Sequence, residues 1–90
     1  MELQDYLANP YKVYVDVNAD FLSDGRILPR HFVWEDGVRY TVDKVVDVRR
    51  AASLKAGGVG LRYTVLVGRR ETYMYLEESH GESRWFMERR

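Results

Sequence analysis

Apolar residues alternate with polar ones along most of this chain, and this spacing constrains its fold more than any other feature. The clearest stretch covers residues 13–21, where valine, alanine and phenylalanine occupy every second position. A period of two places successive side chains on opposite faces of an extended strand, so this stretch predicts a strand with one buried face. Comparable stretches follow at residues 27–34, 38–48, 61–67, 72–77 and 84–88. The chain is therefore expected to be all-β.

Turn residues separate these stretches. Ser23-Asp24-Gly25 and Glu35-Asp36-Gly37 both end in the Asp-Gly pair that favours tight hairpins. The doublet Val45-Val46 shifts the alternation of the third stretch, which indicates a bulge or a bend at a barrel corner. Pro29 lacks an N–H donor, which favours a strand edge or a strand start. This pattern predicts a five- or six-stranded antiparallel meander that closes into an SH3-like or similar small barrel.

Two segments depart from the strand pattern. Leu3, Tyr6 and Leu7 are spaced for one face of a short N-terminal helical turn, which could cover an open end of the barrel. Residues 49–60 form the longest segment without alternation, and residues 51–56 could hold one helical turn. An open sheet backed by the N-terminal helix is the alternative architecture. With 90 residues, the chain is expected to be a single domain over residues 1–90.

The compartment is predicted from what the sequence lacks. Residues 1–5 have neither the basic start nor the apolar stretch of a signal peptide. No apolar run approaches the roughly 20 residues that a membrane-spanning helix requires. The chain contains no cysteine, so it offers no disulfide, thiolate metal site or cysteine nucleophile. We therefore expect a cytoplasmic protein without membrane contact.

No motif in the sequence predicts catalysis, a metal or a cofactor. Asp16, Asn18 and Asp20 have the spacing that opens an EF-hand calcium loop, but the glycine and glutamate that this loop requires further on are absent. His31 and His80 lie far apart and have no partner at zinc-site spacing. The glycine-rich segment before residue 61 lacks the Gly-Lys-Ser/Thr ending of a phosphate loop. We therefore expect a protein that is not an enzyme.

Charge is balanced overall but unevenly distributed. The 14 basic and 14 acidic residues give a formal net charge of zero. Residues 1–25 carry five acids and one base, whereas residues 49–70 carry six bases and no acid. Such an asymmetry predicts a surface with one basic face. The six bases are Arg49, Arg50, Lys55, Arg62, Arg69 and Arg70.

The basic stretch is the best candidate for a binding site. Arg49, Arg50, Lys55 and Arg62 are expected to cluster around the long loop, and they are the predicted nucleic-acid-binding residues. The pair Arg69-Arg70 is expected in a turn at the other end of the intervening strand, roughly 25 Å away. The function predicted first is a non-catalytic module that binds nucleic acid. Two alternatives stay open: a solvated surface that pairs with the acidic N-terminal strand, and a module that binds a larger protein or a second copy through exposed strand edges.

The aromatic residues divide into two groups. Those that fall beside aliphatic residues on the predicted strands are expected in the core, and they are Phe32, Trp34, Tyr40, Tyr63, Trp85 and Phe86. Four tyrosines are harder to bury together, so one or two of them are expected to mark a contact surface. These are Tyr11, Tyr14, Tyr73 and Tyr75.

Three segments carry a resemblance to known proteins: Trp34-Glu35-Asp36-Gly37 with Tyr40, the block from Arg49 to Gly58 with Arg62-Tyr63-Thr64, and Arg84-Trp85-Phe86. The pattern resembles a group of short, uncharacterised proteins from Firmicutes, especially clostridia. More distantly, it is similar to a small domain of unknown function that accompanies Y-family DNA polymerase genes in bacteria. The resemblance covers about residues 12–88. It implies a bacterial accessory protein near DNA repair, and it implies no chemistry for any residue.

Overall fold

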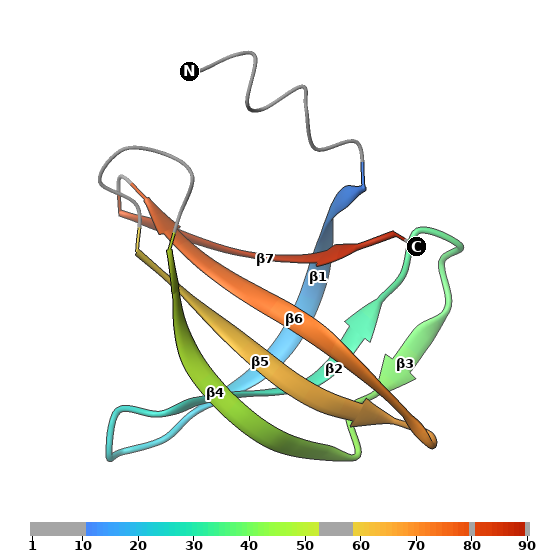
Figure 1. Ribbon diagram of the computed structural model, residues 1–90, viewed down its shortest axis with the longest axis horizontal. Helices are drawn as coiled ribbons and strands as arrows, with labels where there is room; N and C mark the ends of the chain where they lie inside the picture. Colours follow the sequence, from blue (N-terminus) through green and yellow to red (C-terminus); the bar gives the residue numbers. More distant parts are fainter. Residues whose placement is uncertain (1–10, 53–58, 80, 90) are drawn as a thin grey trace.

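The protein is described by a computed structural model that places residues 11–52, 59–79 and 81–89. In this part of the chain, seven strands form one antiparallel sheet (Figure 1). The strands are β1 (Lys12–Phe21), β2 (Ile27–Val33), β3 (Arg39–Thr41), β4 (Lys44–Ala52), β5 (Val59–Val67), β6 (Arg70–Ser79) and β7 (Glu82–Glu88). Their order across the sheet is β3-β2-β1-β7-β6-β5-β4. The one non-sequential pairing joins β1 to β7, close to the two ends of the chain.

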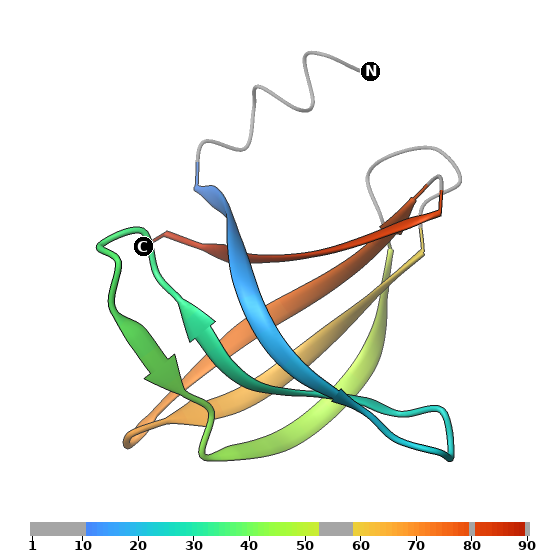
Figure 2. The ribbon, with the colours of Figure 1, turned by 180° about the vertical axis from the view of Figure 1, so that it is seen from behind.

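The sheet curls into a half-barrel, in which β1 and β2 cross over β4, β5 and β6 (Figures 1 and 2). The predicted all-β antiparallel class is confirmed, but the predicted number of five or six strands is wrong. The additional strand arises because the stretch over residues 38–48 changes partner in its middle. Val42 N–H donates to the carbonyl of Arg30 in β2, whereas Asp43 N–H donates to the carbonyl of Leu66 in β5, each at 2.8 Å. The chain therefore leaves one half of the sheet at β3 and enters the other at β4.

The predicted irregularities are confirmed. The register of β4 against β5 shifts between Val45 and Asp47, as the valine doublet indicated. Gly25 and Gly37 adopt φ values of 96° and 82° in the turns that follow β1 and β2, a region that glycine enters without a steric penalty. Pro29 lies beyond the part of β2 that pairs with β3, and its partner Ala19 follows a register shift in the β1–β2 ladder. Proline is tolerated at such a bulge, where a ladder hydrogen bond is already missing.

The core lies on the inner face of the curled sheet. Its buried residues are Phe32, Val42, Tyr63, Val65, Met74, Leu76 and Met87. Tyr63 is only 1% exposed, and its hydroxyl donates to the carbonyl of Ile27 in β2. Because β2 and β5 are not neighbours in the sheet, this bond joins the two halves of the half-barrel across its interior.

The segment expected as a long loop is shorter than the sequence suggested. The antiparallel ladder between β4 and β5 continues to the pair Ala52 and Val59, so residues 49–52 belong to a strand. The rest of the expected helical turn, residues 53–56, and the expected N-terminal helical turn lie outside the described residues. Over residues 11–52, 59–79 and 81–89, no helix has the length and hydrophobicity needed to span a bilayer.

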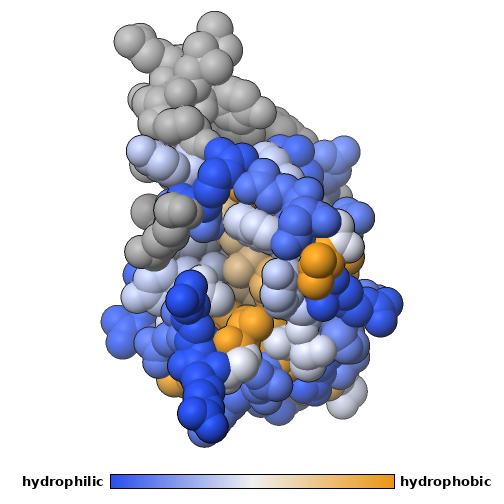
Figure 3. All heavy atoms as spheres, turned by 90° about the vertical axis from the view of Figure 1, so that its right-hand side faces the viewer, coloured by the Kyte–Doolittle hydropathy of each residue, from blue (hydrophilic) through white to orange (hydrophobic). Residues whose placement is uncertain are grey.

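On the side of the molecule that Figure 3 shows, hydrophilic residues break the apolar surface into small areas. Hydrophobic residues stand there in small groups between hydrophilic ones. Val33 and Val38, which flank the turn between β2 and β3, are 37% and 48% exposed. Isolated exposed valines are ordinary on a soluble surface and do not by themselves indicate an interface.

Candidate nucleic-acid interface

A row of five side chains crosses the outer face of the sheet, the face opposite the core. Direct register partners link Arg49 of β4 to Arg62 of β5, Arg62 to Tyr75 of β6, Tyr75 to Phe86 of β7, and Phe86 to Tyr14 of β1. Register partners in antiparallel strands point to the same face, so these five residues form one continuous line, called the outer row below. Strands are about 4.8 Å apart, so the outer row spans roughly 19 Å.

Rings in the outer row pack against one another. The rings of Tyr75 and Phe86 are parallel within 5°, with centroids 4.7 Å apart. Tyr14 meets Phe86 edge-on at 5.9 Å, and Tyr73, two residues before Tyr75, meets Tyr75 at 6.4 Å. Aromatic contacts at these distances add stability beyond the burial of area. The result is a fixed aromatic surface in place of four independent side chains.

Cations lie on these rings. The guanidinium carbon of Arg62 is 4.6 Å from the centroid of Tyr73, and that of Arg84 is 3.9 Å from the centroid of Tyr14. Within the described residues, neither arginine forms an ion pair with a carboxylate, and the buried Nε of Arg62 has no hydrogen-bond acceptor. The ring quadrupole attracts a cation but does not neutralise its charge. Both guanidinium groups therefore keep their charge available for an anion.

A buried carboxylate anchors the other end of the outer row. Glu77 of β6 is only 7% exposed and accepts a hydrogen bond from the Tyr14 hydroxyl at 3.0 Å. The Lys12 Nζ lies 3.2 Å from the same oxygen of Glu77 and 4.4 Å from the centroid of Phe86. Burial alone would lower the pKa of Lys12, but hydrogen bonds to Tyr14 and Glu77 and the charge of Glu77 outweigh it and raise that pKa. This cluster holds Tyr14 and Phe86 in place.

The structure divides the predicted binding residues. Arg49 and Arg62 lie side by side in the outer row, but Arg50 follows Arg49 along β4 and therefore points to the opposite face. Lys55 lies outside the described residues. The expected cluster in a loop is thus wrong for Arg49 and Arg50, because both lie in β4, where alternation separates neighbouring side chains.

Arg49 is held by a neighbour on its own strand. Its Nε donates to Asp47 at 2.8 Å, and both side chains are largely exposed. Asp47 thus offsets the repulsion between Arg49 and Arg62, which face each other across β4 and β5. Exposed pairs of this kind contribute little to stability and exchange readily with other partners.

The remaining two bases lie apart from the outer row. Arg69 lies in the turn between β5 and β6, Arg70 begins β6, and both are exposed. This turn and the β4–β5 connection lie at opposite ends of β5, because consecutive hairpins place their turns at alternate ends of a sheet. Arg62 is five strand residues from Val67, which corresponds to roughly 17 Å.

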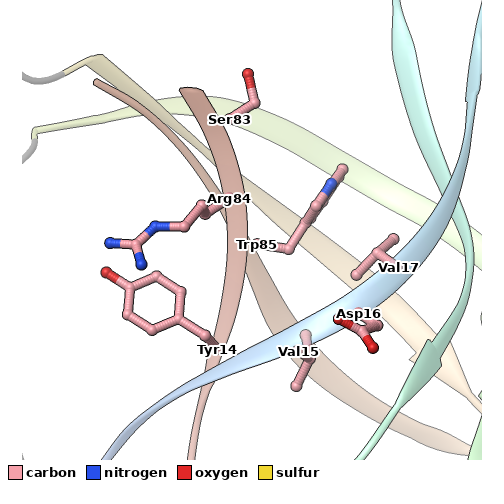
Figure 4. A pocket seen from close by; sticks show the side chains of 7 residues that line it. All are labelled: Tyr14, Val15, Asp16, Val17, Ser83, Arg84 and Trp85. Carbon is pink, nitrogen blue, oxygen red and sulfur yellow. The ribbon is translucent and has the colours of Figure 1, made fainter. Parts of the chain in front are cut away.

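A hollow of about 330 Å³ opens beside the outer row, where β1 and β7 separate (Figure 4). The two strands pair only as far as Val15 and Trp85, after which β1 turns to β2 and β7 stays with β6. In Figure 4, Arg84 and Tyr14 lie on one side of the ribbon of β7, whereas Trp85 and Val17 lie on the other. The volume is at the lower end of the range for small-ligand pockets, about 300–1,000 Å³.

Comparisons with known proteins do not show to which family this chain belongs. No model of a known protein family matches the chain, and neither a curated protein nor a solved structure matches it. Among the described residues, no group of three or more histidine, cysteine, aspartate or glutamate side chains is arranged to hold a metal ion. Any functional statement therefore depends on the site itself.

Sequence reasoning found part of this site. One or two of Tyr11, Tyr14, Tyr73 and Tyr75 were expected at a contact surface, and the last three lie on the outer face. Phe86 was expected in the core, but it shares the outer face with Arg84, because β7 buries the alternate residues Trp85 and Met87. The order Arg84-Trp85-Phe86-Met87 contains this signal, since the period of two places Arg84 and Phe86 on one face and Trp85 and Met87 on the other.

Proposed function

We propose that this protein is a non-catalytic module that binds single-stranded nucleic acid across its outer face. The observation that carries the proposal is the outer row, in which two arginines and three rings stand in register on five neighbouring strands. Proteins that bind single strands combine cations for the phosphates with aromatic surfaces for the bases.

Different residues would serve the two parts of the ligand. Arg62 and Arg84 lie at two points of the outer face without a carboxylate partner among the described residues, so they are the proposed phosphate contacts. Arg49 would join them by exchanging Asp47 for a phosphate. The hollow beside Arg84 and Trp85 would take one base. Because the net charge is zero, binding would depend on this local arrangement and not on attraction to the whole molecule.

The salt dependence of affinity tests the electrostatic part. Two or three phosphate contacts on a single strand predict a log–log slope of about −1.4 to −2.1. The dissociation constant should therefore rise roughly 7- to 20-fold between 50 and 200 mM salt. Fluorescence anisotropy with labelled single-stranded DNA and RNA measures this slope. No binding at tens of micromolar protein in 50 mM salt would overturn the proposal.

A matched pair of variants locates the site. Arg62→Gln with Arg84→Gln removes two charges from the outer face, and Arg69→Gln with Arg70→Gln removes the same charge from the turn after β5. We expect the first variant to lose at least tenfold in affinity and the second to lose less than twofold. Equal losses from the two variants would show that binding depends on net charge and not on the outer face.

A further inference from the structure

β4 ends the sheet and leaves one edge uncovered. It pairs with β5 on one side and has no strand on the other within residues 11–52, 59–79 and 81–89 (Figure 1). Its nine residues give an edge of about 30 Å. Val46 and Val48 on this strand are 47% and 43% exposed. Unpaired N–H and C=O groups beside exposed valines make such an edge a template for another strand.

The charges along β4 are self-complementary. Asp47 and Arg49 flank Val48 and point to the same face of the sheet. We propose that β4 pairs antiparallel with β4 of a second copy of the chain, about a two-fold axis that lies between Val48 and Val48 of the second copy. This pairing places Asp47 opposite Arg49 of the second copy, and Arg49 opposite its Asp47. Opposite charges in direct register stabilise antiparallel pairs.

Symmetry restricts the register. A two-fold axis normal to the sheet leaves every side chain on the same face of the sheet. Opposed residues must share a face, so the axis must lie between a residue and the same residue of the second copy. An axis at Asp47 would oppose two aspartates, and an axis at Arg49 or Arg50 would oppose two arginines. Of these axes, only the one at Val48 opposes unlike charges, and it opposes no like charges from Asp47 to Arg49.

The same charges select the occupant. Charged side chains on an edge normally discourage pairing with unrelated strands. On β4, Asp47 and Arg49 repel a strand that carries like charges in register. On an identical strand, each of the two lies opposite a residue of the other sign. Pairing also brings Val48 against Val48 of the second copy, an apolar contact on the face of the sheet opposite the charged pairs. A second copy of this chain is therefore the partner that this edge fits. The pairing engages Arg49, which is also a proposed phosphate contact, so it is tested without nucleic acid.

Charge-reversal variants test the pairing by sedimentation equilibrium without nucleic acid. We expect the unmodified chain to form a concentration-dependent dimer, and Asp47→Arg and Arg49→Asp each to be monomeric at concentrations where it is dimeric. Mixing the two variants in equal amounts should restore a dimer, because one strand then carries two positive and the other two negative charges in register. The internal pair between residues 47 and 49 is lost in both variants, so it cannot explain recovery. A monomer at every concentration of the unmodified chain, or variants that dimerise as well as it does, would overturn the proposal.

Cysteine substitution tests the register. The chain has no cysteine of its own, so a single introduced thiol gives unambiguous cross-linking. Opposed residues have Cβ atoms about 4.5–5.5 Å apart, close to the reach of a disulfide, whereas Val46 and its copy would be offset by four residues, about 13 Å. Val48→Cys should therefore form a covalent dimer at least tenfold faster than Val46→Cys under mild oxidation. Equal rates, or faster cross-linking of Val46→Cys, would exclude this register.

Discussion

Replacing Tyr63 by phenylalanine should lower the free energy of unfolding by about 1–2 kcal/mol. Tyr63 is 1% exposed, and its hydroxyl donates to the carbonyl of Ile27, on a strand that β5 does not pair with. The substitution keeps the ring, which packs 5.1 Å from Trp85, so it leaves no cavity. The loss measures the contribution of the hydrogen bond that joins β5 to β2 across the interior of the half-barrel.

Two contributions set the magnitude. A typical buried hydrogen bond contributes about 0.5–1.5 kcal/mol net, and a carbonyl left without a donor costs about 1–3 kcal/mol. Ile27 is only half-buried and its bond to Tyr63 is partly buried, so we use the lower part of that range. In a chain of this size, a loss of about 1–2 kcal/mol corresponds to a fall in Tm of roughly 4–16 °C.

Urea unfolding followed by tryptophan fluorescence measures the effect. Tyr73→Phe is the matched control, because Tyr73 is half-buried on the outer face and its hydroxyl makes no hydrogen bond within the described residues. We expect the control to unfold at the same urea concentration as the unmodified chain. If Tyr63→Phe were as stable as the control, the bond to Ile27 would contribute nothing, and the reasoning would be wrong.

The pH dependence gives a second readout. Burial raises the pKa of Tyr63 above its ordinary value of 10.0, and the charge of Glu78 adds to the shift. A group whose pKa is raised by folding contributes stability that is complete below its unfolded pKa and is lost as pH rises through its folded pKa. The stability difference between the unmodified chain and Tyr63→Phe should therefore be constant near neutral pH and shrink above about pH 10.

Two further substitutions test a turn and a surface clamp. Gly37→Ala should cost about 1–2 kcal/mol in thermal or urea unfolding, because φ there is 82°, and Gly37→Asn should cost less because asparagine tolerates this region; equal stability of all three chains would contradict the turn geometry. Glu35→Gln should lower Tm at pH 7, because Arg89 donates two hydrogen bonds to Glu35, at 2.7 and 2.9 Å, and these lower the pKa of that carboxyl from 4.5. A lowered pKa contributes stability above the unfolded value, so the difference in Tm should disappear as pH falls below about 4.5, and a difference that persists at lower pH would contradict this assignment.

The candidate site could be predicted only in part. The basic stretch and a surplus of tyrosines were visible in the sequence, since charge runs and surplus aromatics are compositional. Their arrangement was not visible, because the outer row depends on the registers of four strand pairs. One of these pairs joins Tyr14 to Phe86, which are 72 positions apart in the sequence. A shift of one residue in that pair would put Tyr14 beside Trp85 and turn one of them to the wrong face.

The sequence by itself determined the all-β class, the hairpin turns and the bulge near Val46. These depend on local chemistry: the period of two, the permissive backbone of glycine and the interrupted alternation at adjacent valines. Only the tertiary structure decided where β3 ends and β4 begins, because the alternation continues through Val42 while the partner changes from β2 to β5. It also placed Arg49 and Arg50 on opposite faces, since the ladder between β4 and β5 extends strand geometry into a segment that local propensity assigns to a loop. Propensity acts on neighbours along the chain, whereas a strand exists only with the partner that completes its hydrogen bonds.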